Sequence, residues 1–122
     1  MQRSKTMADA ALLIRWSRPV PGREQQALSL FGTSLEYYGT LQSTGAIESF
    51  EPVLLNPGST DLNGFILIRG SAEQIDALKR EDQFVELMIR GEHLIDGLGV
   101  VDGYLAGDLQ TRMAKYGQVI AQ

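Results

Sequence analysis

One stretch near the C-terminus, HLIDGLGVVDGYLAG at residues 93–107, constrains the fold of this chain more than any other. Its apolar, β-branched segment contains two Asp-Gly pairs, and helical patterns flank it on both sides. β-branched residues favour strands, and Asp-Gly pairs favour turns and bulges. We therefore predict the last strand of a small mixed sheet, a bulged edge strand that turns into a final helix.

The apolar pattern divides the earlier part of the chain into five elements. Runs that are apolar on both faces indicate central strands, and apolar residues spaced three or four apart indicate helices. The predicted elements are a strand at 10–17, a helix at 23–43, strands at 47–55 and 64–69, and helical segments at 71–91. Pro52 has no amide to donate, so the 47–55 strand belongs at a sheet edge.

Local signals predict where the helices begin, end and bury their side chains. Gly45 suits the left-handed residue that ends the first helix. Ser71 and Gln74 form a capping box, Asp82 is expected to cap a second helical segment, and Asp108 is expected to cap the C-terminal helix. The predicted buried face of the first helix comprises Leu28, Phe31, Leu35, Tyr38 and Leu41. The apolar stripe of the C-terminal helix comprises Leu109, Met113, Tyr116 and Ile120.

The order strand, helix, strand, strand, helix, strand predicts an α+β fold, a βαββαβ split sheet with strand order 4-1-3-2 and an added C-terminal helix. Two helices cover one face of such a sheet, and a second copy of the same sheet is the simplest cover for the other. We expect a homodimer, with residues 10–122 as a single domain and residues 1–9 as a flexible N-terminal tail. Translation could begin at Met1 or at Met7.

Composition narrows the classes of function. The chain has 122 residues and no cysteine, which excludes disulfides, thiolate metal sites and a cysteine nucleophile and suits a cytoplasmic protein. The longest apolar runs, AALLI and FILI, are far shorter than the roughly 20 residues of a membrane-spanning helix. The net charge is −4 and the basic residues are scattered, so neither nucleic acid nor a membrane surface is an expected partner.

The segments LLIRW, FEPVLL, GFILIRG and GVVDGYLAG, with an amphipathic helix after the first and a capped helix before the last, resemble the ferredoxin-like dimeric α/β barrel superfamily. The resemblance covers residues 10 to about 106 and lies in element order and apolar pattern. Members include small antibiotic-biosynthesis-type monooxygenases and many proteins of unassigned role. The resemblance implies a dimeric α/β barrel that holds ligands between sheet and helices.

Haem-degrading members of this superfamily use an asparagine, a tryptophan and a histidine. In this chain Trp16 lies on the first predicted strand, whereas Asn56 and Asn63 do not. The order and placement differ from that pattern, so we assign none of those roles.

Two residues are candidates for acid–base chemistry. His93 is the only histidine, and its ordinary pKa lies near neutrality. Tyr104 lies near the other end of the stretch described first. The alternative for His93 is an exposed imidazole that interacts with the carbonyls of a helix end. No G-x-S-x-G sequence is present to indicate a serine nucleophile.

A ligand-binding hypothesis combines aromatic walls with polar tips, which suit apolar ligands. Its candidate residues are Trp16, Tyr37, Tyr38, Tyr104 and Arg15 or Arg18. Ordinary packing in the core and across a dimer is the alternative, and it is the more frequent fate of aromatic residues on strands and helices.

The acids Asp96, Asp102 and Asp108 recur every six residues, which differs from the ligand spacing of a calcium loop. Turns or bulges explain Asp96-Gly97 and Asp102-Gly103 better, so we expect no metal and no cofactor. The Gly-Leu-Gly sequence at 97–99 is too short for a dinucleotide-binding motif.

Two functions from different classes remain. The first is a homodimeric module of unknown function that binds a small apolar ligand. The alternative is a cofactor-independent monooxygenase-like or related small-molecule enzyme, in which His93 or a tyrosine moves a proton. The enzyme requires a cavity of a few hundred Å³ lined by one of these groups.

Overall fold

The computed structural model describes residues 8–56 and 61–121. A four-stranded sheet has the order β3-β4-β1-β6, and every neighbouring pair is antiparallel. Its strands are β1 (Ala10–Trp16), β3 (Ser49–Leu54), β4 (Gly64–Gly70) and β6 (Gly99–Tyr104). The helices are α1 (Glu24–Thr44), α2 (Ala72–Arg80), α3 (Asp82–Leu94) and α4 (Ala106–Ile120). This is the predicted α+β class with the predicted strand order.

Two short strands, β2 (Arg18–Pro19) and β5 (Ile95–Asp96), form a separate ribbon that the sequence pattern did not indicate. Among the described helices, none is long and apolar enough to cross a membrane. Residues 1–7 of the predicted tail lie outside the described residues.

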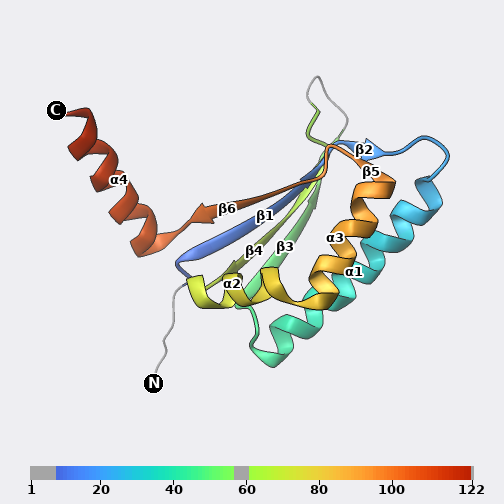
Figure 1. The fold of residues 1–122 in the computed structure, drawn as a ribbon, viewed down its shortest axis with the longest axis horizontal. Helices are drawn as coiled ribbons and strands as arrows, with labels where there is room; N and C mark the ends of the chain where they lie inside the picture. The colour runs from blue at the N-terminus through green and yellow to red at the C-terminus, as the bar shows by residue number, and fades with distance from the viewer. Residues whose placement is uncertain (1–7, 57–60, 122) are drawn as a thin grey trace.

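Helices α1, α2 and α3 lie against one face of the sheet (Figure 1). The core forms between them and the two central strands, β1 and β4, where alternate side chains point toward the helices. The central members of this core are Leu12, Ile14, Ile66 and Ile68, each at most 3% exposed. The opposite face of the sheet has no helix over it in Figure 1.

The buried face of α1 differs from the predicted one. Leu28 is 66% exposed, and Phe31 and Leu35 lie only at the margin of the core. Residues outside the predicted stripe take part in the buried row instead. Ser34 can be buried because its hydroxyl donates to the Leu30 carbonyl at 2.8 Å and is satisfied inside the helix. The buried row comprises Ala27, Leu30, Ser34, Tyr37, Tyr38 and Leu41.

The helix ends confirm some signals and correct others. Gly45 ends α1 with a φ of 83°, and the Ser71–Gln74 capping box is present, as predicted. The cap of α3 is Glu81, without a side-chain hydrogen bond, so the prediction for Asp82 is wrong. α3 also continues beyond Gly91 to Leu94. Leu98 packs closely on Gly91, because an added Cβ there would lie 2.8 Å from the Leu98 side chain. This glycine permits close packing rather than ending the helix.

The last strand is shorter and more regular than predicted. Residues 93 and 94 belong to α3, and β6 pairs with β1 without interruption from Gly99 to Tyr104, so the predicted bulge at Asp102-Gly103 is absent. Gly97 does have a positive φ of 72°, which supports the predicted turn at Asp96-Gly97.

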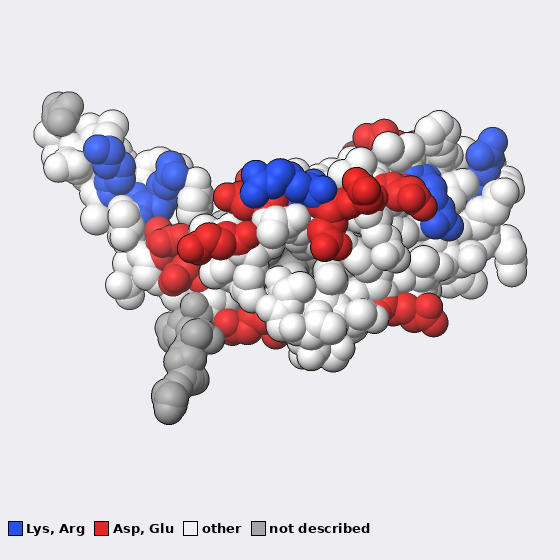
Figure 2. All heavy atoms as spheres, turned by 60° about the horizontal axis from the view of Figure 1, so that its bottom comes forward, with Lys and Arg blue, Asp and Glu red and all other residues white. Residues whose placement is uncertain are grey.

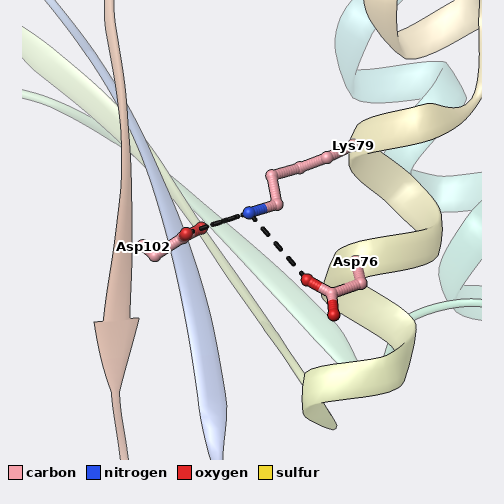
Figure 3. Close-up of polar contacts among 3 residues, drawn as sticks. All are labelled: Asp76, Lys79 and Asp102. Carbon is pink, nitrogen blue, oxygen red and sulfur yellow. Dashed lines mark hydrogen bonds and ion pairs between the residues drawn. The ribbon is translucent and has the colours of Figure 1, made fainter.

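Asp102 connects the edge strand to the helix layer. Its carboxylate accepts hydrogen bonds from the Lys79 ammonium of α2 at 2.9 and 3.1 Å, and Lys79 also lies 4.0 Å from Asp76 (Figure 3). The pair is partly exposed, so its direct contribution to stability is small. The pair nevertheless links α2 to β6.

Helix α4 projects away from the rest of the domain (Figure 1). None of its described side chains is buried. Its first turn is capped by Leu105 without a side-chain hydrogen bond, so Asp108 is not the predicted cap.

The Tyr38 hydroxyl is a polar group inside the core. Tyr38 is 0% exposed, and within the described residues its oxygen has no hydrogen-bond partner. Burial raises the pKa of this hydroxyl well above its ordinary value of 10.0, and the neighbouring Tyr37 adds to the shift. A buried polar group without a partner costs free energy, so this hydroxyl destabilises the fold.

We predict that Tyr38→Phe leaves the free energy of unfolding unchanged or raises it by about 1 kcal/mol at neutral pH. Urea unfolding measures the change. Tyr37→Phe is the matched control: it removes the hydroxyl that donates to Glu81 at 2.7 Å and should lower stability by about 1 kcal/mol. A loss above about 2 kcal/mol in Tyr38→Phe would contradict the prediction.

The same shift predicts a loss of stability in alkali. Because burial raises the pKa of Tyr38 in the folded state, the unfolded chain loses this proton first, and the free energy of unfolding declines as the pH rises above 10.0. Tyr38→Phe should therefore show a shallower decline in stability between pH 9 and pH 11 (roughly the range in which an unfolded tyrosine ionises). Identical declines in both proteins would rule this out.

Candidate functional site

An apolar groove lies at the end of the sheet where β1 meets the β2–β5 ribbon. Its volume is about 330 Å³, within the range of small-molecule sites. Its lining comprises Trp16, Pro19, Glu24, Ala27, Leu28, Phe31, Leu54 and Ile95. We call this the Trp16 groove. Glu24 is the one charged residue in the lining as described, so the site favours an apolar occupant.

Trp16 is held in place by three elements. On β1 it pairs with Gly64 of β4, and its indole ring lies over that glycine: an added Cβ would lie 2.6 Å from the ring. On the other side, the ring of Phe31 from α1 meets it edge-on with the centroids 5.7 Å apart. Gly64 therefore provides the space that the indole occupies, and Phe31 limits its movement.

The rim of the groove consists of apolar side chains that the core leaves outside. Leu28 of α1 is 66% exposed and Leu54 of β3 is 69% exposed. Leu54 pairs with Gly64, so it projects to the same side of the sheet as Trp16. Exposed leucines on both walls form an apolar surface in contact with solvent, which costs free energy unless something covers it.

His93 lies outside the groove. It is exposed near the end of α3, and its Nδ1 lies 3.0 Å from the Ile89 carbonyl oxygen one turn earlier. This geometry is that of the alternative interpretation, an imidazole interacting with helix carbonyls. A hydrogen bond that Nδ1 donates to this carbonyl supports the last turn of the helix.

The aromatic candidates do not gather in one pocket, which corrects the ligand-binding hypothesis as a single constellation. Trp16 lies at one end of β1, whereas Tyr104 pairs with Ala10 at the other end. Tyr37 and Tyr38 lie together in the helix layer, with ring centroids 5.3 Å apart. Of these four residues, only Trp16 lines the groove.

The two arginine candidates are also outside the groove. Arg15 points to the uncovered face of the sheet, where its guanidinium donates to the Asp61 carbonyl at 3.4 Å. Arg18 is exposed on β2. Neither supplies a polar group to the lining.

Tyr37 is poorly suited to transfer a proton near neutral pH. Burial and the Glu81 carboxylate that accepts its hydrogen bond raise the pKa of Tyr37 well above its ordinary range. The hydroxyl therefore stays protonated and connects α1 to the break between α2 and α3. Across the described residues, no group of three or more histidine, aspartate and glutamate side chains is arranged to hold a metal ion.

The sequence pattern indicates Trp16 but not the other walls of the groove. Leu28 was assigned to the core, and Pro19 and Ile95 are brought into place by a ribbon that no pattern indicated. One available signal was Gly64, since close approach to another side chain is a reason for a glycine in a strand.

Comparison with known proteins identifies the fold. No family model matches the chain, and no curated protein matches it. A dimeric protein of unknown function and ferredoxin-like fold from Bacteroides fragilis aligns with a TM-score of 0.60 and 14% identity over 79% of this chain and 95% of its own. An Arabidopsis thaliana protein aligns with a TM-score of 0.60 and 12% identity over 83% of this chain and 91% of its own.

SnoaB, a cofactor-independent oxygenase from Streptomyces nogalater, aligns with a TM-score of 0.51 and 12% identity over 83% of this chain and 94% of its own. At such identities the likeness shows the fold and nothing finer. The chain therefore has the ferredoxin-like α+β fold that the element order and the resemblance predicted. No activity follows from the fold alone.

We predict that Gly64→Ala displaces Trp16, because the new methyl group would overlap the indole ring. Trp16 is the only tryptophan, so its fluorescence emission reports the change directly, and the maximum should shift to longer wavelength as the ring becomes more hydrated. Urea unfolding should show a loss of about 1–3 kcal/mol from overpacking.

Gly103→Ala is the matched control. Gly103 is also a strand glycine, but an added Cβ would lie 3.6 Å from Ala11, an ordinary contact. This variant should leave the emission maximum of Trp16 unchanged. Equal spectra for both variants would contradict the proposed packing of Trp16 on Gly64.

Proposed function

We propose that this protein is a homodimeric module, cytoplasmic and without a nucleic-acid or membrane partner, that binds a small apolar molecule in the Trp16 groove. The observation that carries the ligand proposal is the composition of the groove: about 330 Å³ of space with aromatic and aliphatic walls and one carboxylate at Glu24. Such a site gains free energy from the burial of apolar ligand surface, roughly 25 cal/mol per Å².

Binding is better supported than catalysis. The alternative, a cofactor-independent monooxygenase-like enzyme, needs a group that moves a proton beside the bound molecule. Within the lining as described, His93 and the tyrosines are absent, and Glu24 is the only ionisable residue. We therefore propose that the site recognises its ligand without converting it.

The uncovered face of the sheet supports the homodimer. Because side chains alternate along strands, the pairing register places one set on the side away from the helices. The apolar members of this set are Ala11, Leu13, Val53, Phe65, Leu67 and Val101. A mainly apolar face of this kind suits the same face of a second copy around a two-fold axis. The dimeric Bacteroides fragilis protein has the same fold.

The apolar-ligand proposal predicts saturable binding of N-phenyl-1-naphthylamine, a neutral apolar dye that accepts excitation energy from tryptophan. Trp16, the only tryptophan, lines the groove and serves as the donor. Leu28→Asp should weaken binding at least tenfold, since it places a second carboxylate beside Glu24 in an apolar site.

Ile89→Asp is the matched control for this titration. Ile89 is likewise an exposed aliphatic residue on a helix, 51% exposed, but it lies outside the groove. The dissociation constant of the dye for this variant should stay within about twofold of the wild-type value, well below the tenfold change expected for Leu28→Asp. Equal loss in both variants, or no saturable binding by the wild type, would refute the ligand proposal.

The homodimer proposal predicts a mass of twice 13.4 kDa in size-exclusion chromatography with light scattering. Leu67→Glu introduces a charge at the centre of the uncovered sheet face and should produce monomers, because an unpaired buried charge is costly. Val85→Glu, on the exposed side of α3, should remain dimeric. A monomeric wild type would overturn the assembly.

A further inference from the structure

Helix α4 exposes an apolar stripe that its own protomer does not cover. Its 15 residues include Leu109, Met113, Tyr116 and Ile120, which are 45%, 61%, 58% and 79% exposed. Their spacing of four, three and four residues is the narrow seam by which a helix packs on another surface, rather than the broad face of a helix in a core. An isolated helix of this length is marginal in water, so its stability depends on packing elsewhere.

The opposite side of α4 is polar and faces its own protomer. The Arg112 guanidinium lies 4.3 Å from the centroid of the Tyr104 ring and donates to its hydroxyl. A shallow hollow of about 680 Å³ lies here, lined mainly by Tyr104 and the polar side chains of α4. Figure 2 shows the basic side chains of α4 on the face turned toward the viewer.

The position of Tyr104 shows which way the stripe faces. Tyr104 alternates with Asp102, and the Asp102 carboxylate reaches Lys79 of α2, so both project to the helix-covered side of the sheet. The polar side of α4 meets Tyr104 on that side. With about 100° between successive residues, Arg112 lies beside the stripe, whereas the other polar residues of α4 that line the hollow lie across the helix from it. The stripe therefore points away from the Tyr104 side of its own protomer.

The junction between β6 and α4 carries backbone strain. Ala106 has a φ of 48°, the left-handed conformation that residues with a side chain rarely adopt. Leu105, just before it, is anchored because its amide donates to the Asp9 carbonyl at 2.9 Å. Such strain persists where surrounding contacts fix the chain, and α4 buries nothing on its own protomer.

We propose that α4 is an arm that packs through its apolar stripe on the second copy of the chain whose sheet covers the uncovered face. This inference rests on the proposed homodimer. The small size of the stripe favours the copy that the sheet already contacts over any partner that α4 would have to bind by itself. A stable interface uses about 20–30 residues per side, and four side chains are too few to hold a separate partner. On the partner that the sheet already holds, α4 adds buried apolar area to the same dimer interface.

The test compares two glutamate substitutions on opposite sides of the same helix. Met113→Glu places a charge in the stripe, and Gln118→Glu places the same charge on the polar side. Glutamate is a good helix former, and circular dichroism checks that helicity is retained. In sedimentation equilibrium, Met113→Glu should weaken the dimer at least tenfold, and Gln118→Glu should stay within about threefold of the wild type.

The outcomes separate the arm from the dimer itself. If the wild type is dimeric and Leu67→Glu is monomeric, but Met113→Glu dimerises like the wild type, the arm is refuted and the homodimer stands. A monomeric wild type refutes both. A tetramer that Met113→Glu converts to a dimer also refutes the arm as proposed, because α4 would then join a different pair.

A second measurement does not depend on weakening the dimer. The chain has no cysteine, so a single introduced thiol is a specific probe. In the dimer, the thiol of Met113→Cys should react with Ellman's reagent at least tenfold more slowly than that of Gln118→Cys, although both positions are exposed in the protomer. The two rates should become similar when Leu67→Glu is added. Similar rates in the intact dimer would refute the arm.

Discussion

The central position of β1 is the constraint on which the rest of the structure depends. β1 pairs with β4 on one side and with β6 on the other, so neither of its edges is free. Leu12 and Ile14 point to the helices, and Leu13 points to the opposite side. A strand that is apolar on both faces needs a cover on both, and a single protomer supplies helices to only one. The proposed assembly follows from this imbalance.

The two ends of β1 take different roles because different elements meet there. At the Trp16 end, the β2–β5 ribbon and the start of α1 leave a groove beside the core. At the Ala10 end, β6 finishes and the chain leaves the domain as α4. The register that aligns Ala10 with Tyr104 thus separates a surface suited to a small molecule from a helix suited to a second chain.

Local signals predicted most of the fold, and tertiary packing decided what they missed. Pro52, Gly45 and the Ser71–Gln74 capping box act through their own backbone chemistry, and each appears where it was expected. The predicted face of α1 was wrong at Leu28, which is exposed at the groove, and it left out Ser34, which can be buried because its hydroxyl donates to the Leu30 carbonyl. The groove could not be predicted as a unit, since Trp16, Phe31, Leu54 and Ile95 come from separate elements whose approach no periodicity encodes.

Ligand binding and assembly are physically compatible because they use opposite sides of the sheet. Leu54 and Trp16 both pair with Gly64, which places them on the helix side, whereas Leu67 projects to the uncovered side. A second sheet packed over Leu67 therefore leaves the rim of the Trp16 groove in solvent. The groove would close only through the ligand itself or through movement of the exposed Leu28 and Leu54 side chains, whose free energy of exposure provides the driving force for binding.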